Sequence, residues 1–210
     1  MNASSDFWCL FDRKSPIVVY GHPGTGRSTF LMSFAVHNVK NNSQKRSALV
    51  DCSSRLTINR LRQIAKDSAI LKQILVFQPV SSWNLLEIID DIDLLSQTPP
   101  QILIDNPFWN AKPQDLRYLS YVFSKLRELF ENSSSPSVTV IAVNAQRTKN
   151  RLVPQQRAIL ERYFDNRVLL EKNKRKYWAT INFGSEESLE FELRMTETGL
   201  SIFEGDDFDD

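Results

Sequence analysis

The chain is poor in cysteine and histidine, with two residues of each among 210. Cys9 and Cys52 lie far apart in the sequence, without the close spacing of zinc ligands or the framework of a disulfide-bonded fold. These shortages exclude a disulfide scaffold and a cysteine–histidine metal centre. They favour a reducing compartment.

The chain also lacks an excess of charge of either sign and any long apolar run. Its 26 basic and 25 acidic residues leave a formal net charge of +1. No global field therefore draws it to nucleic acid or to a membrane, and such binding has to come from a local patch. No stretch is long enough to span a bilayer, and residues 1–11 lack the basic start and apolar core of a secretory signal. We expect no membrane partner.

Glycine is scarce as well, but three of the six glycines fall within one short segment, GHPGTGRST at residues 21–29. This segment differs by one residue from the phosphate-loop pattern G-x-x-x-x-G-K-[ST]. An apolar strand-like run precedes it and an amphipathic helical pattern follows, as phosphate binding by backbone N–H groups requires. The sequence thus predicts a nucleotide site made of Gly21, His22, Pro23, Gly24, Thr25, Gly26, Arg27, Ser28 and Thr29.

Arg27 stands where the pattern has lysine. Arginine keeps the positive charge but is a bulky planar fork, so we expect ATP binding to be retained or weakened and hydrolysis to be impaired. Ser28 supplies a hydroxyl for Mg²⁺, and Asp105, which ends an apolar run, is positioned to reach the metal through water. ATP and Mg²⁺ are the expected cofactors.

Apolar runs and helical patterns alternate along most of the chain. This alternation predicts an α/β fold: a mixed sheet with a parallel centre flanked by helices, and antiparallel strands at the C-terminal end. Residues 1–203 form one predicted domain, and residues 204–210 form an acidic tail. Strands are expected at residues 17–20, 47–52, 73–78, 101–105, 138–143, 167–171, 177–183 and 189–195, and helices at 29–39, 56–70, 82–97, 113–132 and 158–164. The apolar residues 7–11 are expected to form an extra strand or a plug on the core.

The order of these motifs resembles the ATPase core of RecA-type recombinases, and especially the eukaryotic strand-exchange recombinase and its paralogues. The matching segments include VTVIAVNAQ at residues 138–146 and the strands that follow residue 166. In that family an Asn-Gln pair senses the γ-phosphate, and the next loop binds single-stranded DNA. The resemblance implies a nucleotide contact at Gln146, although an extra Ala145 separates it from Asn144. It implies DNA contacts at Arg147, Lys149, Arg151 and Arg157.

One departure concerns catalysis. The family has a catalytic glutamate after its second strand, and Ser53 takes that place here. A serine hydroxyl is no general base at neutral pH. We therefore expect no catalytic residue at this position and at most a weak, DNA-linked ATPase.

The segments LERYF at residues 160–164 and QILVFQPVSSWNLLEII at residues 73–89 resemble those of the small SWIM-protein-associated subunit of the Shu complex. That resemblance implies an accessory role in homologous recombination repair, in which the complex assembles or stabilises the recombinase filament on single-stranded or forked DNA. The implied partners are a SWIM-domain protein, another recombinase paralogue and the strand-exchange recombinase. The implied compartment is the nucleus, with the cytoplasm as the alternative.

Two other functions remain open at this point. The phosphate loop is also similar to those of active P-loop ATPases and small-molecule kinases, although the sequence has no arginine-rich lid and carries Asn106 beside Asp105. A structural adaptor that binds no nucleotide is the third possibility, because Arg27 and Ser53 both depart from the catalytic pattern.

Overall fold

The fold is built on one large sheet, and a computed structural model describes residues 7–11, 16–42, 45–94, 100–132, 139–149, 151–174, 176–184 and 188–203. Its strands are β1 (Ile17–Gly21), β2 (Ser47–Asp51), β3 (Ile74–Phe77), β4 (Gln101–Asp105), β5 (Thr139–Arg147), β6 (Leu152–Pro154), β7 (Asn166–Asn173), β8 (Lys176–Phe183), β9 (Leu189–Thr196) and β10 (Gly199–Ile202). Its helices are α2 (Arg27–Asn41), α3 (Ile58–Ala65), α4 (Ser68–Leu71), α5 (Ser82–Leu94), α6 (Asp115–Asn132) and α7 (Arg157–Leu160).

The strands follow the order β10-β9-β8-β7-β1-β5-β4-β2-β3, and β6 pairs with β5. The six strands from β7 to β3 are parallel, and the C-terminal strands β8, β9 and β10 join antiparallel. The central strands β1, β2 and β4 are buried along their whole length, which explains why each is a continuous apolar run ending in a small or acidic residue. The predicted fold class is confirmed.

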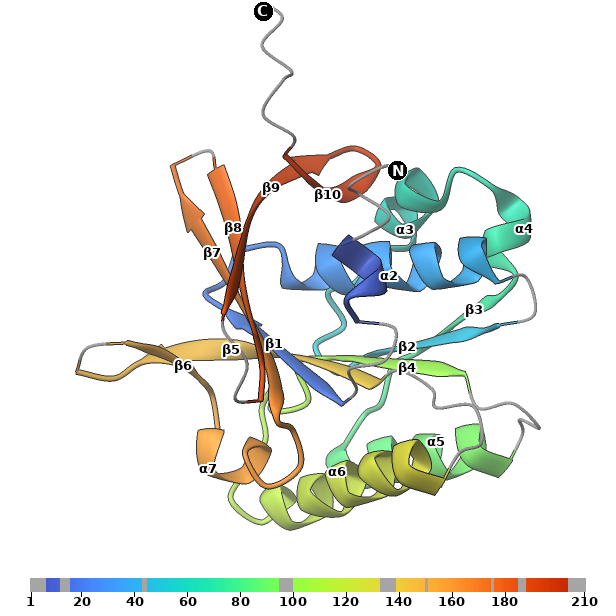
Figure 1. Cartoon of the computed structure of the whole chain (residues 1–210). Coiled ribbons are helices and arrows are strands. Elements are labelled where there is room, and N and C mark those ends of the chain that lie inside the picture. The colour runs from blue at the N-terminus through green and yellow to red at the C-terminus, as the bar shows by residue number, and fades with distance from the viewer. Residues whose placement is uncertain are drawn as a thin grey trace, which may run out of the picture.

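Helices cover both faces of the sheet (Figure 1). Helices α2, α3 and α4 lie on one face together with β10, and α5, α6 and α7 lie on the other. Each face has its own apolar core, and the strands of the sheet separate the two. Because α2 begins where β1 ends, the first core directly supports the segment with the phosphate-loop pattern.

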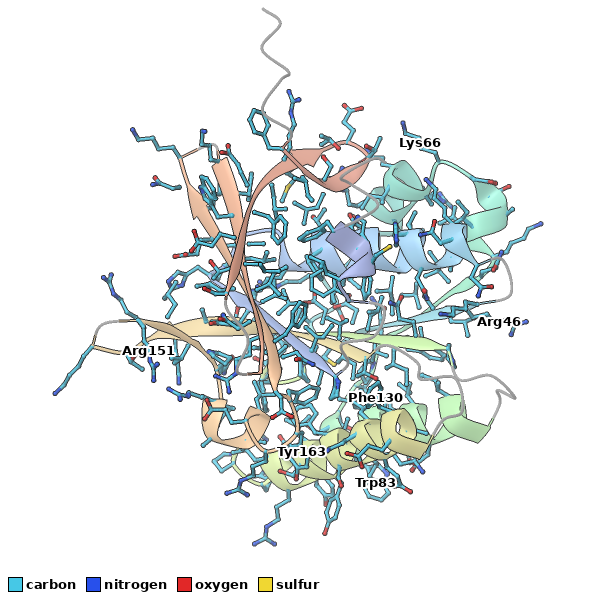
Figure 2. The ribbon with its side chains drawn as sticks, viewed as in Figure 1. Arg46, Lys66, Trp83, Phe130, Arg151 and Tyr163 are labelled. Carbon is cyan, nitrogen blue, oxygen red and sulfur yellow. The ribbon has the colours of Figure 1, made fainter. Side chains whose placement is uncertain are left out.

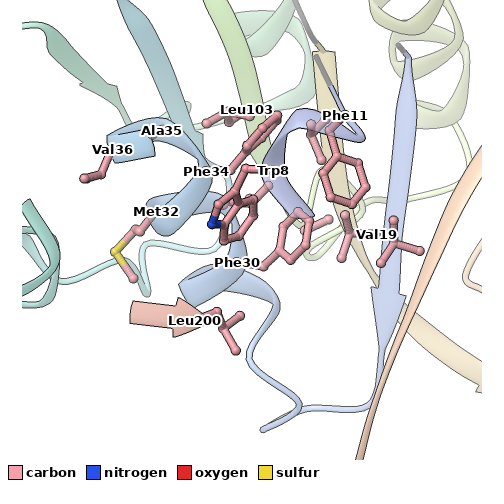
Figure 3. Packing of buried hydrophobic residues seen from close by; sticks show 14 of the residues in the cluster. Trp8, Phe11, Val19, Phe30, Met32, Phe34, Ala35, Val36, Leu103 and Leu200 are labelled. Carbon is pink, nitrogen blue, oxygen red and sulfur yellow. The ribbon is translucent and has the colours of Figure 1, made fainter. Parts of the chain in front are cut away.

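Residues 7–11 form a plug on α2, with a helical turn where one alternative had been an extra strand. The Trp8 ring stacks on Phe34 with centroids 5.5 Å apart, and Phe7 and Phe11 are fully buried. Figure 3 shows the Trp8 and Phe11 rings beside Phe30 and Phe34 of α2. The aromatic residues turn inward because the apolar stripe of α2 would otherwise face water.

Three local predictions were wrong. The helix expected at residues 56–70 is broken in two, because Lys66 takes a left-handed φ of 57° and Asp67 caps the second helix through the Ala69 N–H. The strand expected at residues 138–143 runs on to Arg147 and pairs with β6, a strand that was not predicted. Strand β10 was not predicted at all. The expected tail at residues 204–210 and the ends predicted for residues 95–97 and 138 lie outside the described residues.

Candidate nucleotide and nucleic-acid site

The loop between β1 and α2 has the backbone that its glycines predict. Gly24 and Gly26 adopt φ values of 85° and 91°, the left-handed region that side chains disfavour. A Cβ at Gly21 would collide with the Leu170 carbonyl oxygen and the Thr25 hydroxyl. Thr25 turns the loop by donating from both its N–H and its hydroxyl to the His22 carbonyl oxygen, at 3.2 and 2.9 Å.

The N-terminus of α2 is left without a side-chain cap. Gly26 occupies the N-cap position, no side chain there bonds to the first turn, and that turn contains no acidic residue. The first N–H groups of a helix need acceptors, and together with the helix dipole they favour an anion. The loop therefore fits a phosphate group, with Thr29 in the first turn of the helix behind it.

The Arg27 side chain extends from the start of α2 to Asn144 on β5. Its Nη2 donates a hydrogen bond of 2.6 Å to the side-chain oxygen of Asn144. Its Nη1 is buried and has no hydrogen-bond partner within the described chain. Burial lowers the pKa of the Arg27 guanidinium, while the nearby Asp105 acts in the opposite direction. A buried cationic donor beside an uncapped helix is the feature that best fits a phosphate oxygen.

Ser28 and Asp105 meet directly. The Ser28 hydroxyl donates a hydrogen bond of 2.7 Å to Asp105 Oδ2, and the carboxylate is only 3% exposed. Burial raises the pKa of the Asp105 carboxyl, against the opposing effects of the Ser28 hydrogen bond and the Arg27 charge. A hydroxyl and a carboxylate are suitable oxygen ligands for Mg²⁺, which takes few protein ligands and completes its shell with phosphates and water. No group of three metal-ligating side chains gathers within the described ranges.

Ser53 bonds to the end of β2 and not to the phosphate loop. Its N–H and its hydroxyl both donate to Asp51 Oδ1 at 3.1 Å, and the Leu56 N–H donates to Asp51 Oδ2 at 2.8 Å. Asp51 is fully buried and lies in register with Asp105 on the neighbouring strand. Our sequence reasoning missed this role of Asp51. The sequence Asp-Cys-Ser-Ser at residues 51–54, at the end of a strand, is the available signal, because aspartate and serine side chains close turns over the following N–H groups.

Gln146 and Asn144 occupy different surroundings. Asn144 contacts Arg27, whereas Gln146 is exposed, pairs with Val153 in the hairpin and lines a cavity of about 440 Å³ beside α7. No hydrogen bond within the described residues joins Gln146 to residues 21–29. The structure therefore brings Asn144 to the loop and leaves Gln146 away from it.

The four predicted DNA contacts lie on or next to the β5–β6 hairpin. Arg147, Lys149 and Arg151 are exposed, and Figure 2 shows Arg151 near the end of the hairpin that projects from the body of the protein. Arg157 is the first residue of α7 and is half-buried, with its Nε donating to Glu161 over 2.6 Å. Three of these cations are thus open to solvent, and the fourth is already paired.

Among the comparisons with known proteins, only the one with solved structures found a match. No protein-family model matches the chain, and no curated protein matches it. The fold is similar to that of the crystal structure of the RadB recombinase, with a TM-score of 0.77 and 17% identity over 97% of this chain and 98% of that one. The chain therefore has a RecA-like fold. In the part of the chain that the structure describes, we find no helix that is both long enough and apolar enough for a membrane span.

Proposed function

We propose that the chain is an accessory subunit of RecA-type recombination that binds ATP and Mg²⁺ at residues 21–29 and single-stranded DNA at the β5–β6 hairpin. The observation that carries the proposal is the 2.6 Å hydrogen bond between Arg27 and Asn144. It joins the phosphate loop to the strand whose extension bears Arg147, Lys149 and Arg151.

In this proposal each group of the loop has a defined part. The N–H groups of the uncapped helix and the Arg27 guanidinium bind phosphate oxygens. Ser28 and Asp105 hold Mg²⁺, which neutralises charge on the phosphates. Ser53 bonds to Asp51 and provides no carboxylate to activate water. The site accordingly binds nucleotide and turns it over slowly or not at all.

The hairpin provides the DNA contact. Exposed Arg147, Lys149 and Arg151 are suited to phosphates of a single strand, and such binding weakens steeply with salt. The proposed DNA is single-stranded or forked, and the proposed location is the nucleus.

An aromatic surface on α5 and α6 supports the need for a protein partner. Trp83 and Tyr121 are 54% and 65% exposed, and the Trp83 ring meets Tyr118 edge to face with centroids 5.6 Å apart. Exposed aromatic clusters of this kind mark protein interfaces. The proposed partners are a SWIM-domain protein, another recombinase paralogue and the strand-exchange recombinase.

A structural adaptor without nucleotide is the second candidate. The Ser28–Asp105 hydrogen bond favours it, because it satisfies both side chains without a metal ion. An active P-loop ATPase or kinase is less favoured, since Ser53 provides no base.

Thermal unfolding with and without Mg-ATP tests the proposal. A ligand at about 100 times its Kd stabilises a fold by about 2.7 kcal/mol, which raises the Tm by several degrees in a chain of this size. We expect this shift in the wild type and not in Arg27→Ala. A well-folded wild type that shows no shift, alone or with a co-purified partner, would leave the adaptor as the function.

A further inference from the structure

A second group of arginines surrounds a cavity of about 310 Å³ beside the base of the β5–β6 hairpin. We call it the Tyr20 cavity. It is distinct from the phosphate loop, and its lining includes Tyr20, Arg151, Arg157, Asp165, Arg167 and Asn182.

The fold brings five separate segments to this cavity. Tyr20 lies near the end of β1, and Arg167 lies on the adjacent parallel strand β7, where it pairs with Asn182 of β8. Arg151 comes from the hairpin and Arg157 from the start of α7. No single stretch of the sequence contains the cluster.

Tyr20 provides a buried polar group in the cavity. The residue is 8% exposed, and no hydrogen bond to its hydroxyl is found within the described residues. Burial raises the pKa of the Tyr20 phenol, Glu171 adds to this increase, and Arg167, Arg151 and Arg157 each act to lower it. The phenol therefore remains protonated and able to donate.

One of the three arginines around the cavity forms no ion pair within the described chain. Glu161 accepts from Arg157 at 2.6 Å and from Arg167 at 2.9 Å, so these two arginines are held in place by one carboxylate. Asp165 at the cavity wall and Glu171 on β7 supply two further negative charges, which balance the arginines in number. Arg151 has no ion-pair partner among the residues described, so its guanidinium is available to an anionic ligand.

We propose that the Tyr20 cavity binds a phosphate of a nucleic-acid strand that lies along the β5–β6 hairpin. The proposal rests on the DNA binding proposed above and extends the contact from the hairpin onto β7. Arg151 belongs to both surfaces, so one strand can follow Arg147 and Lys149 and then place a phosphate in the cavity. Arginine forks bind phosphate oxygens in pairs, and the Tyr20 hydroxyl and Asn182 amide add neutral donors.

Binding of the full-length chain to a fluorescent oligothymidine, measured by anisotropy over a range of salt, tests this assignment. We expect Arg167→Gln and Tyr20→Phe each to weaken binding about ten- to a hundredfold, as loss of a hydrogen bond to a charged group does. Loss of the Arg167 contact should also reduce the slope of log K against log salt by about 0.7. The matched control is Lys172→Gln, which removes an exposed charge from the same strand β7, outside the cavity.

The outcomes distinguish a failure of the cavity assignment from a failure of DNA binding by the hairpin. If Arg167→Gln and Tyr20→Phe both bind as Lys172→Gln does while Arg147→Gln loses affinity, the cavity assignment fails and hairpin binding stands. If the wild type binds no oligothymidine at any salt, DNA binding and the cavity assignment fail together. If inorganic phosphate protects the fold through Arg167 without competing with the oligonucleotide, the cavity serves a different phosphate ligand, such as a phosphopeptide, and the assignment is overturned.

Discussion

Asp105 accepts a hydrogen bond of 2.7 Å from Ser28 while standing in register with Asp51 on the next strand. Two buried carboxylates thus lie at the ends of adjacent parallel strands, but they accept hydrogen bonds from different segments. Asp105 faces the phosphate loop, and Asp51 closes the turn that contains Ser53. In the proposed function, this division separates the carboxylate assigned to Mg²⁺ from the turn that contains Ser53.

Asp105→Asn should abolish the response to Mg-ATP without unfolding the protein. The amide oxygen still accepts from Ser28, and removal of a buried charge relieves its desolvation cost. We expect a nucleotide-free Tm equal to or above that of the wild type, and a Mg-ATP shift close to zero. Differential scanning fluorimetry measures both, with Asp91→Asn on the exposed face of α5 as the control. A full Mg-ATP shift in Asp105→Asn would exclude the carboxylate as a metal ligand.

The same substitution predicts a pH dependence. Burial raises the pKa of Asp105 in the folded state above its ordinary value of 3.8. The folded protein therefore holds this proton more tightly than the unfolded chain does, and the carboxyl costs stability as the pH rises from 3.8 through the folded pKa. Asp105→Asn should gain stability over the wild type across that window and show no gain below it. Urea unfolding at a series of pH values measures the difference, and a constant difference would contradict the raised pKa.

Restoring the recombinase residues should create hydrolysis only when both positions are changed. Arg27→Lys removes the planar fork that contacts Asn144, and Ser53→Glu supplies the missing base. General bases contribute about a hundredfold or more to rate, so we expect the double variant to hydrolyse ATP at least tenfold faster than either single variant. A phosphate-release assay with single-stranded DNA present measures this. Equal rates in all four proteins would show that Ser53 does not occupy the base position.

Trp8 and Trp83 offer a matched test of burial. Trp8 is 4% exposed and stacks on Phe34, whereas Trp83 is 54% exposed on α5. Trp8→Ala should lower the free energy of unfolding by about 3–5 kcal/mol, as large-to-small substitutions in a core do. Trp83→Ala should lower it by less than about 1 kcal/mol, because little buried area is lost. Chemical denaturation measures both, and similar losses would mean that residues 7–11 are not seated on α2 in solution.

The sequence predicted the elements whose signals are local. Strand β4 is a buried apolar run ending in Asp105, and the phosphate loop is marked by glycines that its backbone requires. It did not predict the break between α3 and α4, because a lysine at position 66 carries no signal for a left-handed φ. Strand β10 was missed because its place depends on a distant contact, the hydrogen bond from the Leu200 N–H to the Ser33 hydroxyl.

The contacts of the candidate site were likewise predictable only in part. Ser28 and Asp105 could be paired from the motif and the strand order alone. Asn144 could not be assigned to Arg27 from the sequence, because the contact depends on how far β5 runs beyond the neighbouring strand. The Tyr20 cavity was missed for a related reason: its arginines lie on three different elements, and only the sheet order places them together.

The aromatic plug has a consequence for how the chain acquires its structure. Phe7 contacts Phe191 with centroids 5.3 Å apart, and Phe11 contacts Phe183 at 6.1 Å. Residues that precede β1 are therefore packed by residues of β8 and β9, and contacts between distant parts of a chain form slowly. A nascent chain on the ribosome can complete β1 and the phosphate loop early, but the core above α2 stays open until β8 and β9 have emerged. Emergence of β8 and β9, rather than synthesis of the loop, then sets the moment at which the core behind the loop closes.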